Sequence, residues 1–466
     1  MDSNDPFNID HYPSLLLPDE EILLARLEEK GICDFSEIAP PDDLEYLPIV
    51  RGGFVASLLK GELSDFSAPR SGIRIFWCSV IGGIDLRGEE LHFPVRIENC
   101  YIGGKLDLAF SKIKNLELKG TFVEHLDISY IEASGSIVLS YGFKTPTPVW
   151  GMGAKINGQL GCSGGEFGGF PLAIKLEVAQ IEGTFFWRFI KGLKGIVDLT
   201  SASVGLLVDD RESWPDYGNL HLAGFTYKSL GGNTNSSFYD RLEWLKRQAQ
   251  EHLKEDFRSQ PFEQLISVLQ NSGRESEASR IAIQKNHYQR NANFLRRNPK
   301  LVDLKQQQNQ ERSIFRKAIL QGLIDHERRW SLGNVSSFIK ASWVWSASFI
   351  FWAIAGYGYR PLRCLFWSAL IILIGNLCYY HQFAQGNIIF LDDAKAVNVG
   401  TNFYPLVFAA DTYIPFLDLG QSSKWLLKEI PNQKFQPFLL LHWMFIFLGW
   451  FFAAIFGASV TGLVRK

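Results

Sequence analysis

The residues best suited to chemistry lie in one short apolar stretch near the C-terminal end of the chain, D-T-Y-I-P-F-L-D from Asp411 to Asp418. Its polar groups are the two terminal carboxylates and the hydroxyl groups of Thr412 and Tyr413, and Pro415 interrupts it. An ionisable side chain in an apolar setting is costly, so it points to an ion or proton pathway. We therefore predict a candidate site in this stretch.

Other polar residues near the apolar segments have simple and functional interpretations. For Asp411, the simple interpretation is a helix cap or a pair with Lys424. His442 lies near the start of an apolar segment, where an interfacial histidine is the simple interpretation and a polar group at membrane depth the functional one. Four arginines are candidates for binding lipid headgroups, with a solvated face and ordinary topogenic charge as the alternative: Arg328, Arg329, Arg360 and Arg363.

Nothing in the sequence predicts a catalytic centre, a metal site or a cofactor. The nine histidines are dispersed, no serine stands in a G-x-S-x-G motif, and the six cysteines form no C-x-x-C pair. The cysteines are best explained as reduced, packed thiols. The net charge is -2, so charge offers no argument for binding nucleic acid.

Two long apolar segments must position the candidate site. Residues 362–380 contain one charge, Arg363, and residues 438–464 contain none. A span of a bilayer needs about 20 apolar residues, so we predict an integral membrane protein whose partner is the lipid bilayer. Residues 341–358 carry three tryptophans and are predicted to form an interfacial helix, with a third span as the competing interpretation.

Basic residues beside the spans predict their orientation. Lysine and arginine are concentrated before the first span and at the C-terminal end, whereas the connection 381–436 has four lysines and five acids. We therefore predict that both termini face the cytoplasm, and the acidic N-terminus, which lacks a signal peptide, agrees. Three spans would place the termini on opposite sides, which disfavours that alternative.

Residues 51–235 are predicted to form a β-solenoid. Short runs such as I-G-G-I-D-L recur, with starts at positions 81, 102 and 123 and again at 156, 181 and 204. A period near 20 residues with such short strands is typical of stacked coils, each too small to bury its own apolar side chains. Cys78 and Cys100 should then be neighbours inside the stack. The alternative is a β-sandwich of hairpins.

The I-x-G-x-L-x-L pattern resembles pentapeptide-repeat and related right-handed β-helix proteins, in degenerate form. With the two spans and the F-x-x-D-T-Y-I-P-F-L-D-L-G sequence between them, residues 50–466 resemble a bacterial family of membrane-associated β-helix proteins. The resemblance implies a right-handed solenoid and a location in the bacterial inner membrane. Some members of that family are labelled oxidoreductases; without a cofactor or metal motif in this chain, we predict that it is not an enzyme.

The predicted fold is therefore mixed: a right-handed β-solenoid, a helical segment and an α-helical transmembrane domain. Residues 1–50 are predicted as an N-terminal helical cap, residues 236–330 as a cytoplasmic helical region and residues 331–466 as the membrane domain. Within the helical region, we predict helices over 241–254, 261–270 and 274–290. The last two form an αα-hairpin that should cap the open end of the solenoid or mediate assembly.

Residues 402–420 are apolar for an exposed loop and too broken by proline to span, so we predict a re-entrant segment, a short helix with an extended return. Span, re-entrant helix, filter and span resembles the plan of two-span tetrameric cation channels. Their filter often reads T-T-V-G-Y-G-D, and residues 412–418 match its first and last positions. Pro415 and Leu417 replace its glycines, so potassium selectivity is not predicted. The alternative is a packed periplasmic cap.

Two functions are compatible with this organisation, and we favour the first. In the first, the protein is a membrane-anchored scaffold or sensor whose β-helix binds a cytoplasmic protein partner. In the second, a tetrameric two-span channel uses residues 411–418 as a filter and the β-helix as sensor or vestibule; this requires a homo-oligomer, which we predict. An enzyme that binds saccharide in a β-helix groove is a distant third.

Overall fold

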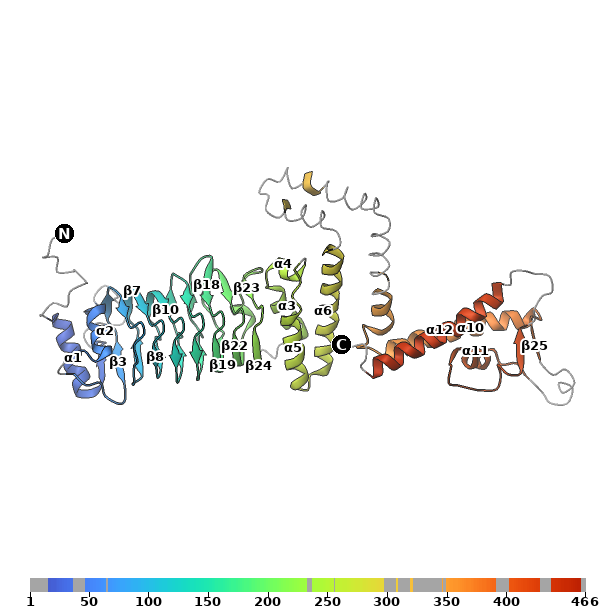
Figure 1. Ribbon diagram of the computed structural model, residues 1–466, viewed down its shortest axis with the longest axis horizontal. Helices are drawn as coiled ribbons and strands as arrows, with labels where there is room; N and C mark the ends of the chain where they lie inside the picture. Colours follow the sequence, from blue (N-terminus) through green and yellow to red (C-terminus); the bar gives the residue numbers. More distant parts are fainter. Residues whose placement is uncertain are drawn as a thin grey trace. The chain divides into compact units, whose positions relative to one another are not determined.

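The computed structural model describes residues 16–36, 47–63, 66–232, 237–254, 256–296, 307–308, 319–321, 346, 349–390, 402–427 and 437–461. The chain divides into two compact units, Met1–Ala292 and Asn293–Lys466. The fold class is mixed, as predicted: a β-solenoid over residues 73–231 is followed by a helical region with two long apolar helices (Figure 1).

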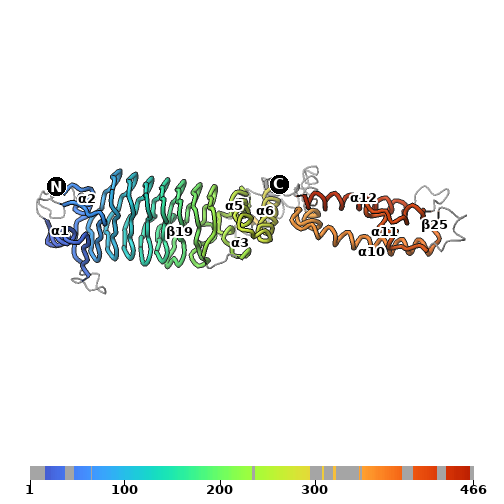
Figure 2. The backbone as a smooth tube through the Cα atoms, turned by 90° about the horizontal axis from the view of Figure 1, so that it is seen from below, coloured from blue at the N-terminus to red at the C-terminus, as the bar shows by residue number. Residues whose placement is uncertain are grey.

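The solenoid has about seven coils, whose strands pair coil to coil in two sheets (Figure 2). The first sheet contains β1 (Ile32–Asp34), β3 (Ile73–Phe76), β6 (Val95–Glu98), β8 (Lys112–Ile113), β9 (Leu116–Glu117), β11 (Glu132–Ala133), β12 (Ile137–Val138), β15 (Lys155–Ile156), β16 (Leu160–Gly161), β19 (Gln180–Trp187), β22 (Ser203–Asp209) and β24 (Thr226–Gly231). The second contains β2 (Ile49–Arg51), β4 (Ser79–Ile81), β5 (Ile84–Asp85), β7 (Tyr101–Asp107), β10 (Phe122–Asp127), β13 (Lys144–Thr145), β14 (Val149–Trp150), β17 (Glu166–Phe167), β18 (Leu172–Lys175), β20 (Gly192–Leu193), β21 (Ile196–Asp198) and β23 (Leu220–His221). These strands pair in parallel, which excludes the hairpin sandwich.

Apolar side chains at equivalent positions of successive coils form one continuous core. One column of directly paired residues, each at most 2% exposed, contains Ile84, Leu106, Leu126, Val149, Ile174, Val197 and Leu220. Because one coil cannot bury its apolar surface alone, this stacking between coils is what stabilises the solenoid. Cys78 and Cys100 are buried neighbours, as predicted, with their Sγ atoms 3.6 Å apart, and both are free thiols.

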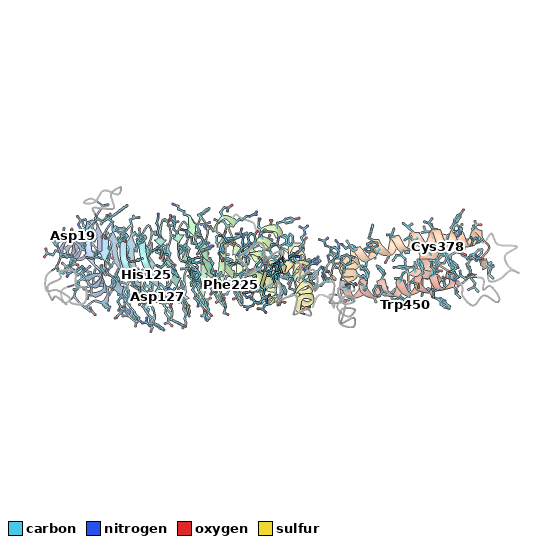
Figure 3. The ribbon with its side chains drawn as sticks, turned by 90° about the horizontal axis from the view of Figure 1, so that it is seen from above. Asp19, His125, Asp127, Phe225, Cys378 and Trp450 are labelled. Carbon is cyan, nitrogen blue, oxygen red and sulfur yellow. The ribbon has the colours of Figure 1, made fainter. Side chains whose placement is uncertain are left out.

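A recurring aspartate forms one corner of the coils. Its Oδ1 accepts a hydrogen bond of 3.0–3.1 Å from the backbone N–H two residues later, an Asx turn, in four pairs: Asp85 with Arg87, Asp107 with Ala109, Asp127 with Ser129 and Asp198 with Thr200. The next residue adopts a positive φ in each case: Gly88, Phe110, Tyr130 and Ser201. The side chain of Asp127 is labelled in Figure 3. This local hydrogen bond holds a conformation that otherwise favours glycine.

Two helices close the N-terminal end of the solenoid: α1 (Pro18–Lys30) and α2 (Gly52–Lys60). Helix α2 directly follows β2, which pairs with β4, while β1 pairs with β3. The buried Glu20 carboxylate of α1 accepts hydrogen bonds from the Arg51 side chain, including one of 2.9 Å from Nε. Burial alone would raise the pKa of Glu20, but its hydrogen bonds from Arg51 and from the Leu17 N–H outweigh burial and lower it.

The other end is closed by α3 (Phe238–Lys246), α4 (Gln250–Leu253), α5 (Gln260–Asn271) and α6 (Glu275–Arg296), the last of which belongs to the same unit as far as Ala292. The predicted αα-hairpin corresponds to α5 and α6, and Gly273 ends the turn between them with φ 73°. The predicted helix over 241–254 is instead two short helices. Gln260 Nε2 donates to the Phe225 carbonyl oxygen at 3.0 Å, and Gln264 Nε2 to that of Tyr227 at 2.7 Å. These amides satisfy backbone groups that the last strand would leave unpaired.

The second unit contains α10 (Leu362–Ala384), α11 (Pro405–Tyr413) and α12 (Pro437–Val460), with the antiparallel pair β25 (Ile388–Phe390) and β26 (Trp425–Leu427) (Figure 1). Within the described residues, α10 and α12 are the two helices long and apolar enough to cross a membrane, with mean hydropathy 1.7 and 2.1. Of the predicted interfacial helix 341–358, the structure describes residues 346 and 349–358, which are helical over 349–355; the remainder lies outside the described residues.

Candidate functional site

Helix α11 packs alongside both long helices and carries the predicted site at its C-terminal end. Near its beginning, the Phe408 ring lies 4.9 Å from that of Tyr379 of α10, centroid to centroid. At its end, Tyr413 Oη lies 3.3 Å from Ser368 Oγ of α10. The Tyr413 backbone also meets α12 at Gly449, where an added Cβ would overlap the Tyr413 carbonyl oxygen. The position of α11 therefore depends on a glycine.

We expect Gly449→Ala to force α11 away from α12 and to destabilise the second unit by about 1–3 kcal/mol, the usual cost of overpacking. Thermal unfolding of the full chain in detergent measures this effect. The matched control is Gly457→Ala on the same helix, where an added Cβ meets nothing within 4 Å. Equal stability of the two variants would contradict the close contact.

Asp411 organises the chain that follows α11. Its carboxylate accepts hydrogen bonds from three backbone N–H groups, those of Leu419 at 2.6 Å, Gln421 at 2.9 Å and Ser422 at 2.7 Å. The simple interpretation of Asp411 as a cap is therefore close to what is observed, except that the donors belong to the loop 419–422 rather than to a helix. A carboxylate with three such donors is already satisfied as an acceptor.

The other predicted filter residues are placed differently from one another. Thr412 and Tyr413 are the last two residues of α11, and Pro415 lies in the turn that follows. The Thr412 Oγ1 atom is buried and has no hydrogen-bond partner among the described residues. Asp418 is exposed, and its Oδ1 accepts a hydrogen bond of 2.9 Å from the Gly420 N–H. Neither Asp411 nor Asp418 belongs to a group of three or more potential metal-binding side chains within the described residues.

His442 has a partner that sequence reasoning missed. Its Nδ1 lies 2.9 Å from Tyr379 Oη across the α10–α12 contact. The Tyr379 ring, 1% exposed, also packs edge-on against Phe408 and Phe445. The sequence signal was a polar residue in each of two apolar segments, but nothing in their spacing indicates that they meet. This pair links α10 to α12 by a polar contact within their otherwise apolar interface.

Arg360 and Arg363, two of the predicted headgroup ligands, lie together at the start of α10. The Arg363 guanidinium carbon is 5.9 Å from the centre of the Trp352 ring. Arg360 is exposed and directly precedes Pro361, the N-cap of α10. Arg328 and Arg329 lie outside the described residues.

The solenoid has a polar surface groove of about 440 Å³ that sequence reasoning did not identify. Neighbouring coils place three charged residues side by side along the groove: Lys112, Glu132 and Lys155. Lys155 Nζ lies 2.9 Å from Glu132 Oε1. Glu90 and His92 line it at the N-terminal end. The signal was a charged residue recurring once per coil, which the repeat alone could have revealed.

Across the described ranges, no group of three or more histidine, cysteine, aspartate or glutamate side chains is arranged to hold a metal ion. The groove and the α11 segment are thus two separate features, one in each unit. No protein-family model, curated protein or solved structure matches the chain.

Proposed function

We propose that the protein is a membrane-anchored scaffold or sensor, in which the second unit is the anchor and the solenoid binds a partner. The observation that carries this proposal is the exposure of α10 and α12. Only 17% of the most apolar window of each helix is buried. A core helix of a soluble protein would be mostly buried, so these helices need an apolar environment that the described part of the chain does not supply.

The end of α11 contacts α12 near the middle of that helix, which supports a re-entrant segment in this anchor. Gly449, which contacts Tyr413, is near the middle of the 24-residue helix α12, roughly 17 Å from either end at about 1.5 Å per residue. Phe403 and Trp425, before and after the α11 loop, both pack on Phe383 near the end of α10. The segment thus enters and returns at one end of the helix pair.

The hydrogen bonds of Asp411 support the same proposal. Non-helical backbone is tolerated at membrane depth only where its polar groups are satisfied. Asp411 satisfies three backbone N–H groups of the returning chain, and Asp418 satisfies a fourth. We infer that Asp411 stabilises the packed loop and is not an ion ligand, which favours an anchor over a pore.

In the proposed scaffold, the solenoid presents its polar groove to a protein partner in the cytoplasm and performs no catalysis. Both ends of the solenoid are closed by helices, which leaves its sides for binding. The basic residues before α10 support an orientation with both termini in the cytoplasm. The resemblance described above supports the bacterial inner membrane as the location.

When the full chain is expressed in a bacterial host, we expect it to stay with the membranes after alkaline carbonate and to be released by detergent. Protease added to spheroplasts should leave residues 73–231 intact, and protease added to inverted vesicles should digest exposed loops of the same region. Release by carbonate would contradict the anchor, and digestion in spheroplasts would contradict the orientation.

A tetrameric channel is the second candidate, favoured by the depth of the α11 loop and by Phe416, which is 81% exposed beside Trp450. Figure 3 labels Trp450 on α12. The mass of the detergent-solubilised protein separates the candidates, because two spans of a single chain cannot enclose a pore. A monomer supports the anchor; a tetramer whose currents change with Asp418→Asn would replace it with the channel.

A further inference from the structure

Two arginines at the start of α10 form a positive pair that has no acidic partner among the described residues. The Arg363 N–H donates to the Arg360 carbonyl oxygen at 3.1 Å, so both residues belong to one turn. Residues 349–390 contain no aspartate or glutamate, and no ion pair of either arginine occurs within the described part of the chain. Like charges three residues apart on one turn repel, so an external anion would stabilise this pair.

The Arg363 guanidinium and the stem of Arg360 each contact a neighbouring group. Arg363 lies over the Trp352 ring, and this cation–π contact holds its guanidinium group near the indole. The stem of Arg360 packs against Gly356, where an added Cβ would come within 3.2 Å of Arg360 Cβ. The turn itself is tight, since residues 356–358 all have positive φ and the Arg360 N–H donates to the Ala355 carbonyl oxygen. The backbone that carries the pair is therefore held in a defined turn, which lowers the entropic cost of presenting both arginines to one ligand.

Exposed apolar side chains continue from the arginines along the first turns of α10. Leu362 is 75% exposed, Leu365 48% and Phe366 67%. Trp367 Nε1 donates to the Ala353 carbonyl oxygen at 3.3 Å, which places an indole beside them. A positive pair followed by apolar surface, with tryptophan between, is complementary to a molecule with an anionic head and apolar tails.

We propose that Arg360 and Arg363 bind the phosphate group of an anionic glycerophospholipid, whose acyl chains lie on Leu365 and Phe366. Each guanidinium offers a planar fork of N–H donors that fits two phosphate oxygens, which a lysine ammonium does not match. This inference rests on the proposed membrane anchor and adds a lipid preference to it.

The full chain in nanodiscs of phosphatidylcholine with a minor fraction of phosphatidylglycerol tests the site, with bound lipid measured by native mass spectrometry. Each arginine should contribute on the order of fivefold to the preference for phosphatidylglycerol. Arg360→Gln/Arg363→Gln should therefore remove most of it, and Arg363→Lys should remove part. The matched control, Lys424→Gln, changes a basic residue in the loop after α11 and should keep the preference.

Equal lipid preference in the unchanged protein and the double variant would overturn the site while leaving the anchor intact. Failure of the unchanged protein to enter nanodiscs of either composition would instead overturn the anchor. If Arg363→Lys enters the nanodiscs and keeps the full preference for phosphatidylglycerol, charge alone suffices. That result would overturn the role of the guanidinium fork.

Discussion

Replacing Arg241 by methionine should destabilise the solenoid by about 3–5 kcal/mol, because it leaves a buried carboxylate without its counter-charge. Arg241 of α3 donates two hydrogen bonds to Asp209 at the end of β22, of 2.6 and 2.8 Å. Both side chains are 2% exposed. Trp214 Nε1 donates a third bond to this carboxylate at 2.8 Å. Urea unfolding of the detergent-solubilised full chain, followed by near-UV circular dichroism, measures the loss.

A second substitution separates the charge from the packing. Asp209→Asn removes the buried charge but keeps an oxygen that accepts from Trp214, so Asp209→Asn/Arg241→Met should regain much of the stability lost in Arg241→Met. Lys246→Met on the same helix, whose ion pair with Glu243 is half-exposed, should change stability by less than about 1 kcal/mol. A double variant no more stable than Arg241→Met would contradict the explanation by uncompensated charge.

Replacing Asp411 by alanine should destabilise the second unit by at least about 3 kcal/mol, since three backbone donors lose their acceptor at once. The expected readout is a lower unfolding temperature in detergent and faster proteolysis between α11 and α12. Asp411→Asn keeps one carbonyl oxygen and should fall between alanine and the unchanged protein.

Asp418→Ala is the matched control for Asp411→Ala. Asp418 is exposed and accepts one hydrogen bond from the Gly420 N–H, so its loss should cost less than about 1 kcal/mol. Equal losses at the two positions would contradict the structural role of Asp411. Unchanged stability in Asp411→Ala, together with altered ion currents, would return Asp411 to the pore hypothesis.

The repeat could be predicted from the sequence because it is periodic, and the apolar segments could be predicted because they are long. Stacked coils need an apolar residue at the same position in every coil, so the pattern that specifies the core is written once per coil. The α10 and α12 helices are specified by runs of about 20 residues with almost no charge, which makes them apparent before any contact is known. Even the neighbouring positions of Cys78 and Cys100 were predictable from a separation of one coil.

The role of the corner aspartates could have been predicted from the sequence, but it was not. Asp107 and Asp127 recur at the interval of one coil, and a short polar side chain before a turn is a known signal for an Asx turn. The break between α3 and α4 was less accessible. Its residues are good helix formers. Tertiary contacts hold the region instead: the Arg247 side chain donates to the Pro215 carbonyl oxygen at 2.7 Å, and the Arg247 carbonyl oxygen accepts from the Gly218 N–H at 2.9 Å.

What the sequence determined by itself is therefore the periodic part of this protein: the coils, their apolar core and the two long apolar helices. The tertiary structure alone decided the polar partners, which join residues far apart in the chain, such as Asp209 with Arg241 and Tyr379 with His442. The physical reason is that burial recurs with secondary structure and leaves a period in the sequence. A single hydrogen bond between distant residues leaves none, so the acceptor role of Asp411 could be seen only once the chain had folded.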